Sequence, residues 1–226
     1  MRSTDALWNG LDAVLTVALG ASCAACGELL EHPSRGPVCD ICWRSVDAAV
    51  PCAFGISSAV DDAQAIGLYD GALRSIVHSL KYEGRRSLAT PLGARMRERC
   101  RTVLDDAEVA VPVPLHASRR RERGFNQAFD LARELGLPVT RALRRVRATR
   151  TQTELSVAER HENVTAAFAP SRLSFRRRHV SGRVVVLVDD VSTTGATLHA
   201  CAIVLKEIGA REVRAVTAAK VATPPR

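Results

Sequence analysis

Long uninterrupted apolar segments are missing from this chain of 226 residues. The nearest approach, residues 13–19, is far shorter than the roughly 18 residues that a membrane-spanning helix needs. Asp5 and Asp12 interrupt the stretch around it, which excludes the long apolar region of a secretory signal peptide. Apolar residues recur there at helical spacing, so a short amphipathic helix is expected over residues 7–18. We therefore expect a cytoplasmic protein with no transmembrane segment and with reduced thiols.

Lysine and aromatic residues are scarce. Only Lys81, Lys206 and Lys220 accompany the many arginines among the 32 basic residues, and aromatic residues make up 4% of the chain. The preference for Arg is typical of a GC-rich genome, which makes the placement of Lys81 informative. A formal net charge of +8 suits an anionic partner, such as a nucleic acid, a phosphate ester or a membrane surface. Apolar residues at 46% and charged residues at 25% exclude a wholly disordered or collagenous chain.

Four of the seven cysteines form two Cys-x-x-Cys pairs: Cys23, Cys26, Cys39 and Cys42. Two such pairs can place four thiolates tetrahedrally around one zinc ion, each pair on its own tight turn. Gly27 follows the first pair, where such a turn commonly needs a residue with positive φ. The alternatives are two disulfides or four unrelated thiols, and the odd number of cysteines disfavours disulfides. Because four protein thiolates leave no open coordination position, the predicted Zn²⁺ is structural.

The rest of the chain alternates between strand and helix patterns. The run at 184–188 is apolar and rich in β-branched residues, which is typical of a central parallel strand. Strand–helix alternation of this kind predicts an α/β fold, which we place at residues 58–226, behind an N-terminal module of residues 1–57. We expect strands at 63–69, 108–115, 184–188 and 212–218, and helices at 71–83, 87–103, 124–135 and 198–208.

A strand, two acids, a loop of small residues and a helix follow one another at residues 184–197. In parallel sheets ligands bind at the carboxyl ends of strands, and the free N–H groups of a helix N-terminus favour a phosphate. Gly195 permits close approach of the backbone, whereas Asp189 and Asp190 suit ribose hydroxyls or the water around a magnesium ion that a pyrophosphate holds. The alternative is a capped helix beside two surface acids. Hydroxyl donors come from Thr193, Thr194 and Thr197.

Residues 184–197 resemble the phosphoribosyl pyrophosphate (PRPP) signature of type I phosphoribosyltransferases. With the cysteine pairs, further segments make the chain similar to the ComF family of late-competence proteins, which is related to amidophosphoribosyltransferases. The resemblance runs from about residue 23 to the end. It implies a type I phosphoribosyltransferase-like parallel sheet flanked by helices, behind a small zinc-ribbon module. These further segments are residues 69–74, 81–82, 111–115, 123–128, 149–155, 160–163 and 167–168.

The resemblance also implies which residues bind PRPP. Asp189 and Asp190 would contact the ribose hydroxyls. The loop and the first helical turn would hold the 5′-phosphate through backbone N–H groups. This phosphate loop consists of Thr193, Thr194, Gly195, Ala196 and Thr197.

A second group of residues would handle the pyrophosphate and its Mg²⁺. By resemblance, the turn after Pro114 occupies the pyrophosphate position, and residues 119–127 correspond to the flexible loop that closes over it. In a working enzyme, Lys81, Arg119 or Arg123 would neutralise the charge of the departing magnesium pyrophosphate. The alternative for each basic residue is an ordinary solvated surface charge.

The segment from His116 to Arg150 carries ten Arg against three acidic residues. Such density predicts contact with a nucleic-acid backbone, whereas the two aromatic residues of the segment, Phe125 and Phe129, offer little base stacking. The alternative is an Arg-rich solvated helix face. The candidate nucleic-acid contacts are Arg119, Arg120, Arg121 and Arg123.

Two functions of different classes remain open from the sequence. In the first, the protein is a phosphoribosyltransferase that uses PRPP and an acceptor whose identity is open. In the second, it is a non-catalytic accessory protein of natural transformation, which binds PRPP and single-stranded DNA and acts with other DNA-uptake proteins. The family resemblance implies the role in DNA uptake, and no acceptor pocket or general base is evident from the residues.

Overall fold

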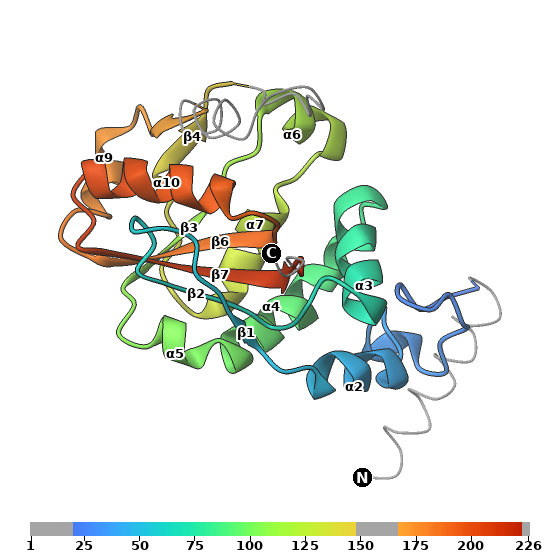
Figure 1. Ribbon diagram of the computed structural model, residues 1–226. Helices are drawn as coiled ribbons and strands as arrows, with labels where there is room; N and C mark the ends of the chain where they lie inside the picture. Colours follow the sequence, from blue (N-terminus) through green and yellow to red (C-terminus); the bar gives the residue numbers. More distant parts are fainter. Residues whose placement is uncertain (1–19, 148–166, 223–226) are drawn as a thin grey trace, which may run out of the picture.

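The computed structural model describes residues 20–147 and 167–222 (Figure 1). The helix expected over residues 7–18 and the motifs at 149–155 and 160–163 lie outside these ranges. In the N-terminal module, η1 (Pro33–Arg35) lies between the cysteine pairs and α2 (Asp40–Ala48) follows them. Pro33 occupies the first position of η1, where the fixed φ of proline suits a helix start.

Five strands form the central sheet in the order β1-β2-β7-β6-β3. Neighbours from β2 to β3 are parallel, whereas β1 pairs antiparallel with β2. The mixed α/β fold with a mostly parallel sheet is therefore confirmed. β1 precedes the expected domain boundary at residue 57 although it belongs to this sheet. The strands are β1 (Cys52–Ala53), β2 (Asp62–Ala65), β3 (Val109–Pro112), β6 (Val184–Ser192) and β7 (Glu212–Lys220).

Helices cover both faces of the sheet (Figure 1). On one face, Val186 and Val188 of β6 pack in an apolar cluster with α3 (Gly71–Tyr82), α4 (Ala89–Arg99) and α7 (Gln127–Ala132). On the other face, Val185 and Leu187 pack with α10 (Ala196–Glu207). A separate antiparallel ribbon of β4 (Leu143–Arg145) and β5 (Phe168–Pro170) packs on the α10 side, and α9 (Ser174–Arg178) follows it. The alternation of β6 side chains thus divides the core into two layers.

The structure corrects the expected helices at two places. The helix expected at 87–103 is divided into η2 (Arg86–Leu88), α4 and α5 (Arg101–Leu104). The break between α4 and α5 falls at Cys100, whose backbone leaves helical geometry. The helix expected from residue 124 begins only at Gln127 and continues into η3 (Arg133–Leu135). Gly124, with φ of +75°, ends a further helix, α6 (Ala117–Arg123), where a flexible loop was expected. Left-handed backbone at Gly124 therefore separates two helices.

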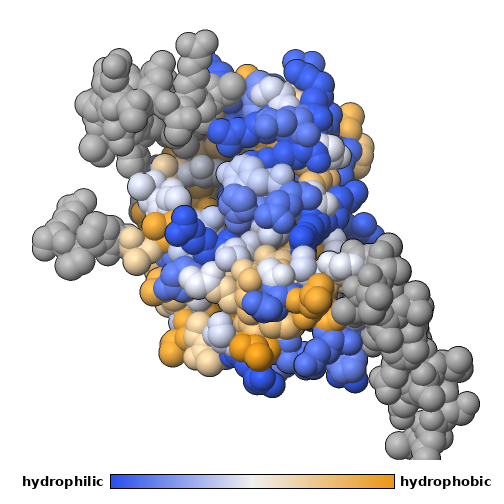
Figure 2. All heavy atoms as spheres, turned by 90° about the vertical axis from the view of Figure 1, so that its right-hand side faces the viewer, coloured by the Kyte–Doolittle hydropathy of each residue, from blue (hydrophilic) through white to orange (hydrophobic). Residues whose placement is uncertain are grey.

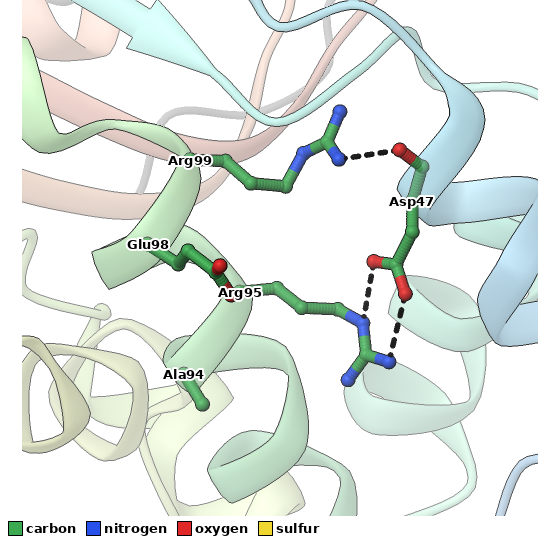
Figure 3. A pocket seen from close by; sticks show the side chains of 5 residues that line it. All are labelled: Asp47, Ala94, Arg95, Glu98 and Arg99. Atoms are coloured by element: carbon green, nitrogen blue, oxygen red, sulfur yellow. Dashed lines mark hydrogen bonds and ion pairs between the residues drawn. The ribbon is translucent and has the colours of Figure 1, made fainter.

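The N-terminal module contacts the rest of the chain along α2 and α4. The Asp47 carboxylate accepts hydrogen bonds of 2.8 and 3.1 Å from Arg95, whose guanidinium lies 3.7 Å from the ring centroid of Trp43. Arg99 donates to the main-chain carbonyls of Asp47 and Ala49, where a cation stabilises the C-terminus of α2. Figure 3 shows Asp47, Arg95 and Arg99 at this junction, where they border a hollow. The volume of the hollow is about 420 Å³. The hollow is lined by Asp47, Ala94, Arg95, Glu98 and Arg99.

Candidate functional site

The four predicted zinc ligands lie together in space. The Sγ atoms of Cys23, Cys26, Cys39 and Cys42 are all within 4.8 Å of one another, and those of Cys26 and Cys39 are 3.9 Å apart. Four sulfurs bound at about 2.3 Å to one zinc ion would be about 3.8 Å apart, so the donor set fits a tetrahedral ion. Gly27 has φ of +81°, as the turn after the first pair requires. The cluster can therefore hold a zinc ion.

Backbone N–H groups point at one of these sulfurs. The Cys23 Sγ accepts hydrogen bonds from the N–H groups of Ala25, at 3.4 Å, and Cys39, at 3.3 Å. Burial raises the pKa of Cys23, but these N–H groups and that of Cys26 outweigh it and lower the pKa to about 6. Burial raises the pKa of Cys42 well above its usual range. Metal binding at this cluster is thus coupled to the release of protons from the other thiols.

The paired acids lie inside β6, not in the loop after it. β7 pairs with β6 as far as Ser192, so the expected strand end at residue 188 was four residues too early. Strand alternation turns Asp189 and Asp190 toward opposite faces of the sheet. Asp190 is buried on the α3 side, whereas half-buried Asp189 faces the side of α10. A ligand lying across the end of β6 would therefore meet one acid from each face.

Lys81, at the C-terminal end of α3, forms an ion pair with Asp190. The Nζ and Oδ1 atoms are 2.8 Å apart, and the side chains are only 18% and 8% exposed. Burial lowers the pKa of Lys81, but the charge of Asp190, with a smaller contribution from Asp189, outweighs it, so the pKa of Lys81 is raised. Burial and the charge of Asp190 raise the pKa of Asp189 to about 7, against an opposing effect of Lys81. The site thus holds a carboxyl group that exchanges its proton near neutrality.

The predicted phosphate loop follows directly on the acids. Thr193 and Thr194 are exposed, and Gly195, with φ of +81°, precedes the first residue of α10. The first N–H groups of a helix have no acceptor within the helix. In α10 the N–H of Ala196 forms a weak hydrogen bond of 3.4 Å to the Thr194 hydroxyl. A β-carbon on Gly195 would lie 2.8 Å from Ile56, so packing requires this glycine in addition to its φ. The loop therefore offers N–H and hydroxyl donors at the carboxyl edge.

The other predicted residues lie on neighbouring elements. Val113 donates to the carbonyl of Val188 at 2.9 Å, so Pro114 follows β3 at the same edge of the sheet as the acids. The Arg123 guanidinium, at the end of α6, lies 4.9 Å from the ring centroid of Tyr82, the neighbour of Lys81 in the sequence. The structure thus places Arg123 beside the C-terminal end of α3, which carries Lys81.

Sequence reasoning missed Arg145 on β4. Burial and the charge of Arg119 lower the pKa of Arg145, whereas Cys201 and Asp189 oppose that shift. The Arg145 guanidinium lies 5.2 Å from the ring centroid of Phe168. One arginine among ten in this segment carries no local signal that distinguishes it. The β4–β5 ribbon that carries Arg145 packs against α10, which is a tertiary contact and not a local pattern.

The structure leaves the other arginines of α6 on the surface. Arg119, Arg120 and Arg121 are exposed, and none of them forms an ion pair within the described residues. Figure 2 shows that hydrophilic residues cover the upper part of the face it presents, whereas apolar residues gather in the lower part. A second basic cluster lies on and before α9, in which Arg176 is half-buried and the other members are exposed. It comprises Arg172, Arg176, Arg177 and Arg178.

The parallel sheet with acids and a small-residue loop at its carboxyl edge defines a phosphoribosyltransferase-type domain. The phosphoribosyl transferase domain family matches residues 121–225. Among solved structures, glutamine PRPP amidotransferase from B. subtilis is 23% identical with a TM-score of 0.38, over 58% of this chain and 27% of that chain. A purine phosphoribosyltransferase from Pyrococcus horikoshii is 18% identical with a TM-score of 0.34, over 60% and 76%. The chain spans about a quarter of the amidotransferase that it matches.

Curated relatives match a larger share of the chain than the domain family does. Competence protein F of Haemophilus influenzae is 35% identical over 66% of this chain and 68% of its own length. The DNA utilization protein YhgH of Salmonella typhimurium is 34% identical over 85% and 81%. Competence protein ComFC of Bacillus subtilis is 26% identical over 92% and 86%. The chain belongs to the ComF family, as its motifs predicted.

Membrane spans were also sought among the described helices. Within residues 20–147 and 167–222, none of the helices has the length and apolar character that crossing a bilayer requires.

Proposed function

We propose that the carboxyl edge of β6 and β3 binds PRPP together with Mg²⁺. The observation that carries this proposal is the convergence of a phosphate loop, two carboxylates and the buried Lys81 at one edge of the sheet. The N–H groups before α10 suit the 5′-phosphate, and Asp189 and Asp190 suit ribose hydroxyls. The turn after Pro114 would receive the pyrophosphate. The carboxylate and phosphate oxygens of such a complex are the ligands that Mg²⁺ prefers.

A transferase reaction at this edge would be a nucleophilic substitution at the anomeric carbon. The acceptor forms a bond to that carbon while the bond to the pyrophosphate oxygen breaks, and the pyrophosphate leaves with its electron pair. Bound magnesium would supply charge neutralisation for the leaving group. Lys81 and Arg123, which lies beside the C-terminal end of α3, would add positive charge there, and Asp189 and Asp190 would orient the ribose.

The cysteine cluster supports a structural role for zinc in the N-terminal module. Four thiols at tetrahedral spacing would leave no coordination position for a substrate. The hydrogen bonds between Arg95 and Asp47 would then hold the metal-bound module against α4. We therefore assign Zn²⁺ to folding of this module and not to the reaction.

The second candidate function is binding of single-stranded DNA without turnover of PRPP. Two observations favour it: the exposed arginines of α6, and the names of relatives, which are a DNA utilization protein and competence proteins. Under this alternative the protein would act with other proteins of DNA uptake. The PRPP site would then hold a ligand that controls the protein.

Two measurements separate these functions. Equilibrium binding of labelled PRPP, with and without Mg²⁺, tests the site that both share. Release of pyrophosphate in the presence of candidate nucleobases and amines then tests transfer. PRPP binding with acceptor-dependent release supports the transferase, binding without release supports the accessory protein, and no binding contradicts both.

A further inference from the structure

Lys220, the last residue of β7, contacts the main chain of the phosphate loop. Its Nζ donates to the main-chain carbonyl of Thr193 at 2.5 Å and to that of Val221 at 2.9 Å. The ammonium also lies 5.6 Å from the ring centroid of Phe54. The main chain of Lys220 pairs with Ser192, directly before the loop. This lysine is therefore fixed at both its backbone and its side chain beside the loop.

The connecting segment between the cysteine module and β2 lies against the same loop. Ile56 fills the space beside Gly195, as its 2.8 Å approach to a β-carbon built there shows. One residue further, the Ser57 hydroxyl lies 2.5 Å from Nδ1 of His199 in the second turn of α10. With Phe54 under Lys220, three residues of this segment support the loop and the helix that follows it.

A bond to the Thr193 carbonyl has a direct consequence for the next N–H group. In a trans peptide the C=O and N–H bonds point in opposite directions. The structure contains no cis peptide among the described residues, so a carbonyl drawn toward Lys220 turns the N–H of Thr194 to the opposite side. That side is away from Lys220, where the proposed 5′-phosphate would lie. Ile56 then restricts the following peptide at Gly195.

We propose that Lys220 is a positioning residue, which with Ile56 holds the phosphate loop in its binding conformation before the ligand arrives. The proposal rests on the proposed function, since it assigns an orienting role at the same PRPP site. A lysine suits this task because its compact ammonium carries several donors and can reach two carbonyls from one point. Lys220 is also one of only three lysines in a chain whose basic residues are otherwise arginines.

The test compares Lys220→Met with Lys206→Met. Lys206 is a matched control because it forms an ion pair with Asp61, at 2.7 Å, at the other end of α10. The first readout is amide hydrogen exchange of His199 and Val221 in the ligand-free protein, since these two N–H groups donate to carbonyls of Gly195 and Ser192. We expect both amides to exchange about fivefold or more faster in Lys220→Met and at the wild-type rate in Lys206→Met.

The second readout is the affinity for PRPP with Mg²⁺. Lys220→Met should weaken it about tenfold, because one oriented donor to the phosphate is lost, while its dependence on salt stays the same. Ile56→Ala should act in the same direction, which keeps the test valid if one variant unfolds. Unchanged exchange in Lys220→Met and Ile56→Ala would overturn the proposal, as would an unchanged affinity. A third outcome is that the wild type binds no PRPP although the amides of Lys220→Met exchange faster. This outcome would contradict the proposed function, whereas the positioning of the loop by Lys220 would still be supported.

Discussion

The Nζ of Lys81 lies 2.8 Å from Oδ1 of Asp190, and both side chains are more than four-fifths buried. The two residues are far apart in the sequence and come from α3 and β6. A buried charge without its partner costs far more than the pair gains, so each residue constrains the other. The pair therefore fixes the position of one carboxylate and one cation at the candidate site before any ligand is present.

Replacement of Lys81 by Met should destabilise the ligand-free protein by about 2–4 kcal/mol, because it leaves Asp190 buried without a partner beside Asp189. The double variant Lys81→Met/Asp190→Asn should lose clearly less than the sum of the single variants. Urea unfolding measures both quantities. Lys206→Met, which removes a half-exposed ion pair, should cost less than about 1 kcal/mol. If the losses of unfolding free energy in the two single variants simply add up in the double variant, Lys81 and Asp190 are not energetically coupled.

The raised pKa of Asp189, about 7, predicts how PRPP affinity depends on pH. If the carboxylate binds ribose, affinity should fall about tenfold for each pH unit below 7, because a proton must leave first. Stability should change in the opposite sense: protonation stabilises the folded protein at low pH, and this contribution is lost as the pH rises through about 7. Burial and the charge of Asp190 raise the pKa of Asp189, and Lys81 opposes them.

Asp189→Asn supplies the control for this pH dependence. PRPP itself gains protons in acid, and that contribution remains in the variant. Calorimetric titrations between pH 5.5 and pH 8.5 should therefore show a steeper loss of affinity in the wild type than in Asp189→Asn. Parallel pH profiles for the two proteins would contradict a role for this carboxylate.

Metal analysis of reduced protein should find one zinc ion per chain at the four clustered cysteines. Cys39→Ser should weaken zinc binding about tenfold or more and loosen the N-terminal module, because metal binding and local folding are coupled. Cys52→Ser is the matched control, since Cys52 is a free thiol outside the cluster. The α/β core should largely survive in both variants. Metal-free wild type after growth with ample zinc would contradict the prediction.

The arginines of α6 should contact the backbone of single-stranded DNA. Replacing Arg119, Arg120, Arg121 and Arg123 by Ala should make the slope of log affinity against log salt shallower by about 2–3, at about 0.7 for each lost phosphate contact. The control replaces the four arginines of the α9 cluster, which changes the net charge equally. An equal effect of both sets would indicate a general charge effect and contradict a specific role for α6.

The sequence predicted the parallel sheet, the cysteine cluster and the loop of small residues between β6 and α10, because each has a local pattern of spacing or polarity. Phosphate binding by this loop stays a prediction. The sequence did not predict α6 or the left-handed Gly124 that ends it, since residues 119–127 resembled a flexible loop and Gly124 was expected to begin the next helix. It placed the acids after the strand, whereas the pairing of β7 with β6 extends the strand past them. The scarcity of lysine draws attention to Lys220, but its hydrogen bond to the Thr193 carbonyl depends on tertiary packing, which no local pattern reports.

The sequence also predicted only part of the reason for glycine at position 195. From the sequence, Gly195 permits close approach of the backbone to a phosphate. In the structure, Ile56 occupies the space beside it and the φ is positive, so a valine there would be strained with or without a ligand. Loss of binding in Gly195→Val would therefore not identify a phosphate site, and Asp190 offers the more informative substitution.

Calorimetric titration of PRPP in the presence of Mg²⁺, on wild type, Asp190→Asn and Asp61→Asn, tests the central claim most directly. Asp61 is the matched control, because it is also paired with a lysine but lies at the opposite end of the sheet. We predict magnesium-dependent binding by the wild type, weaker binding of ribose 5-phosphate, and a loss of about 1.5–3 kcal/mol in Asp190→Asn if its ribose hydrogen bond is made. Asp61→Asn should bind within about twofold of the wild type. No binding by the wild type, or equal binding by Asp190→Asn, would contradict the account and leave the loop as a helix cap.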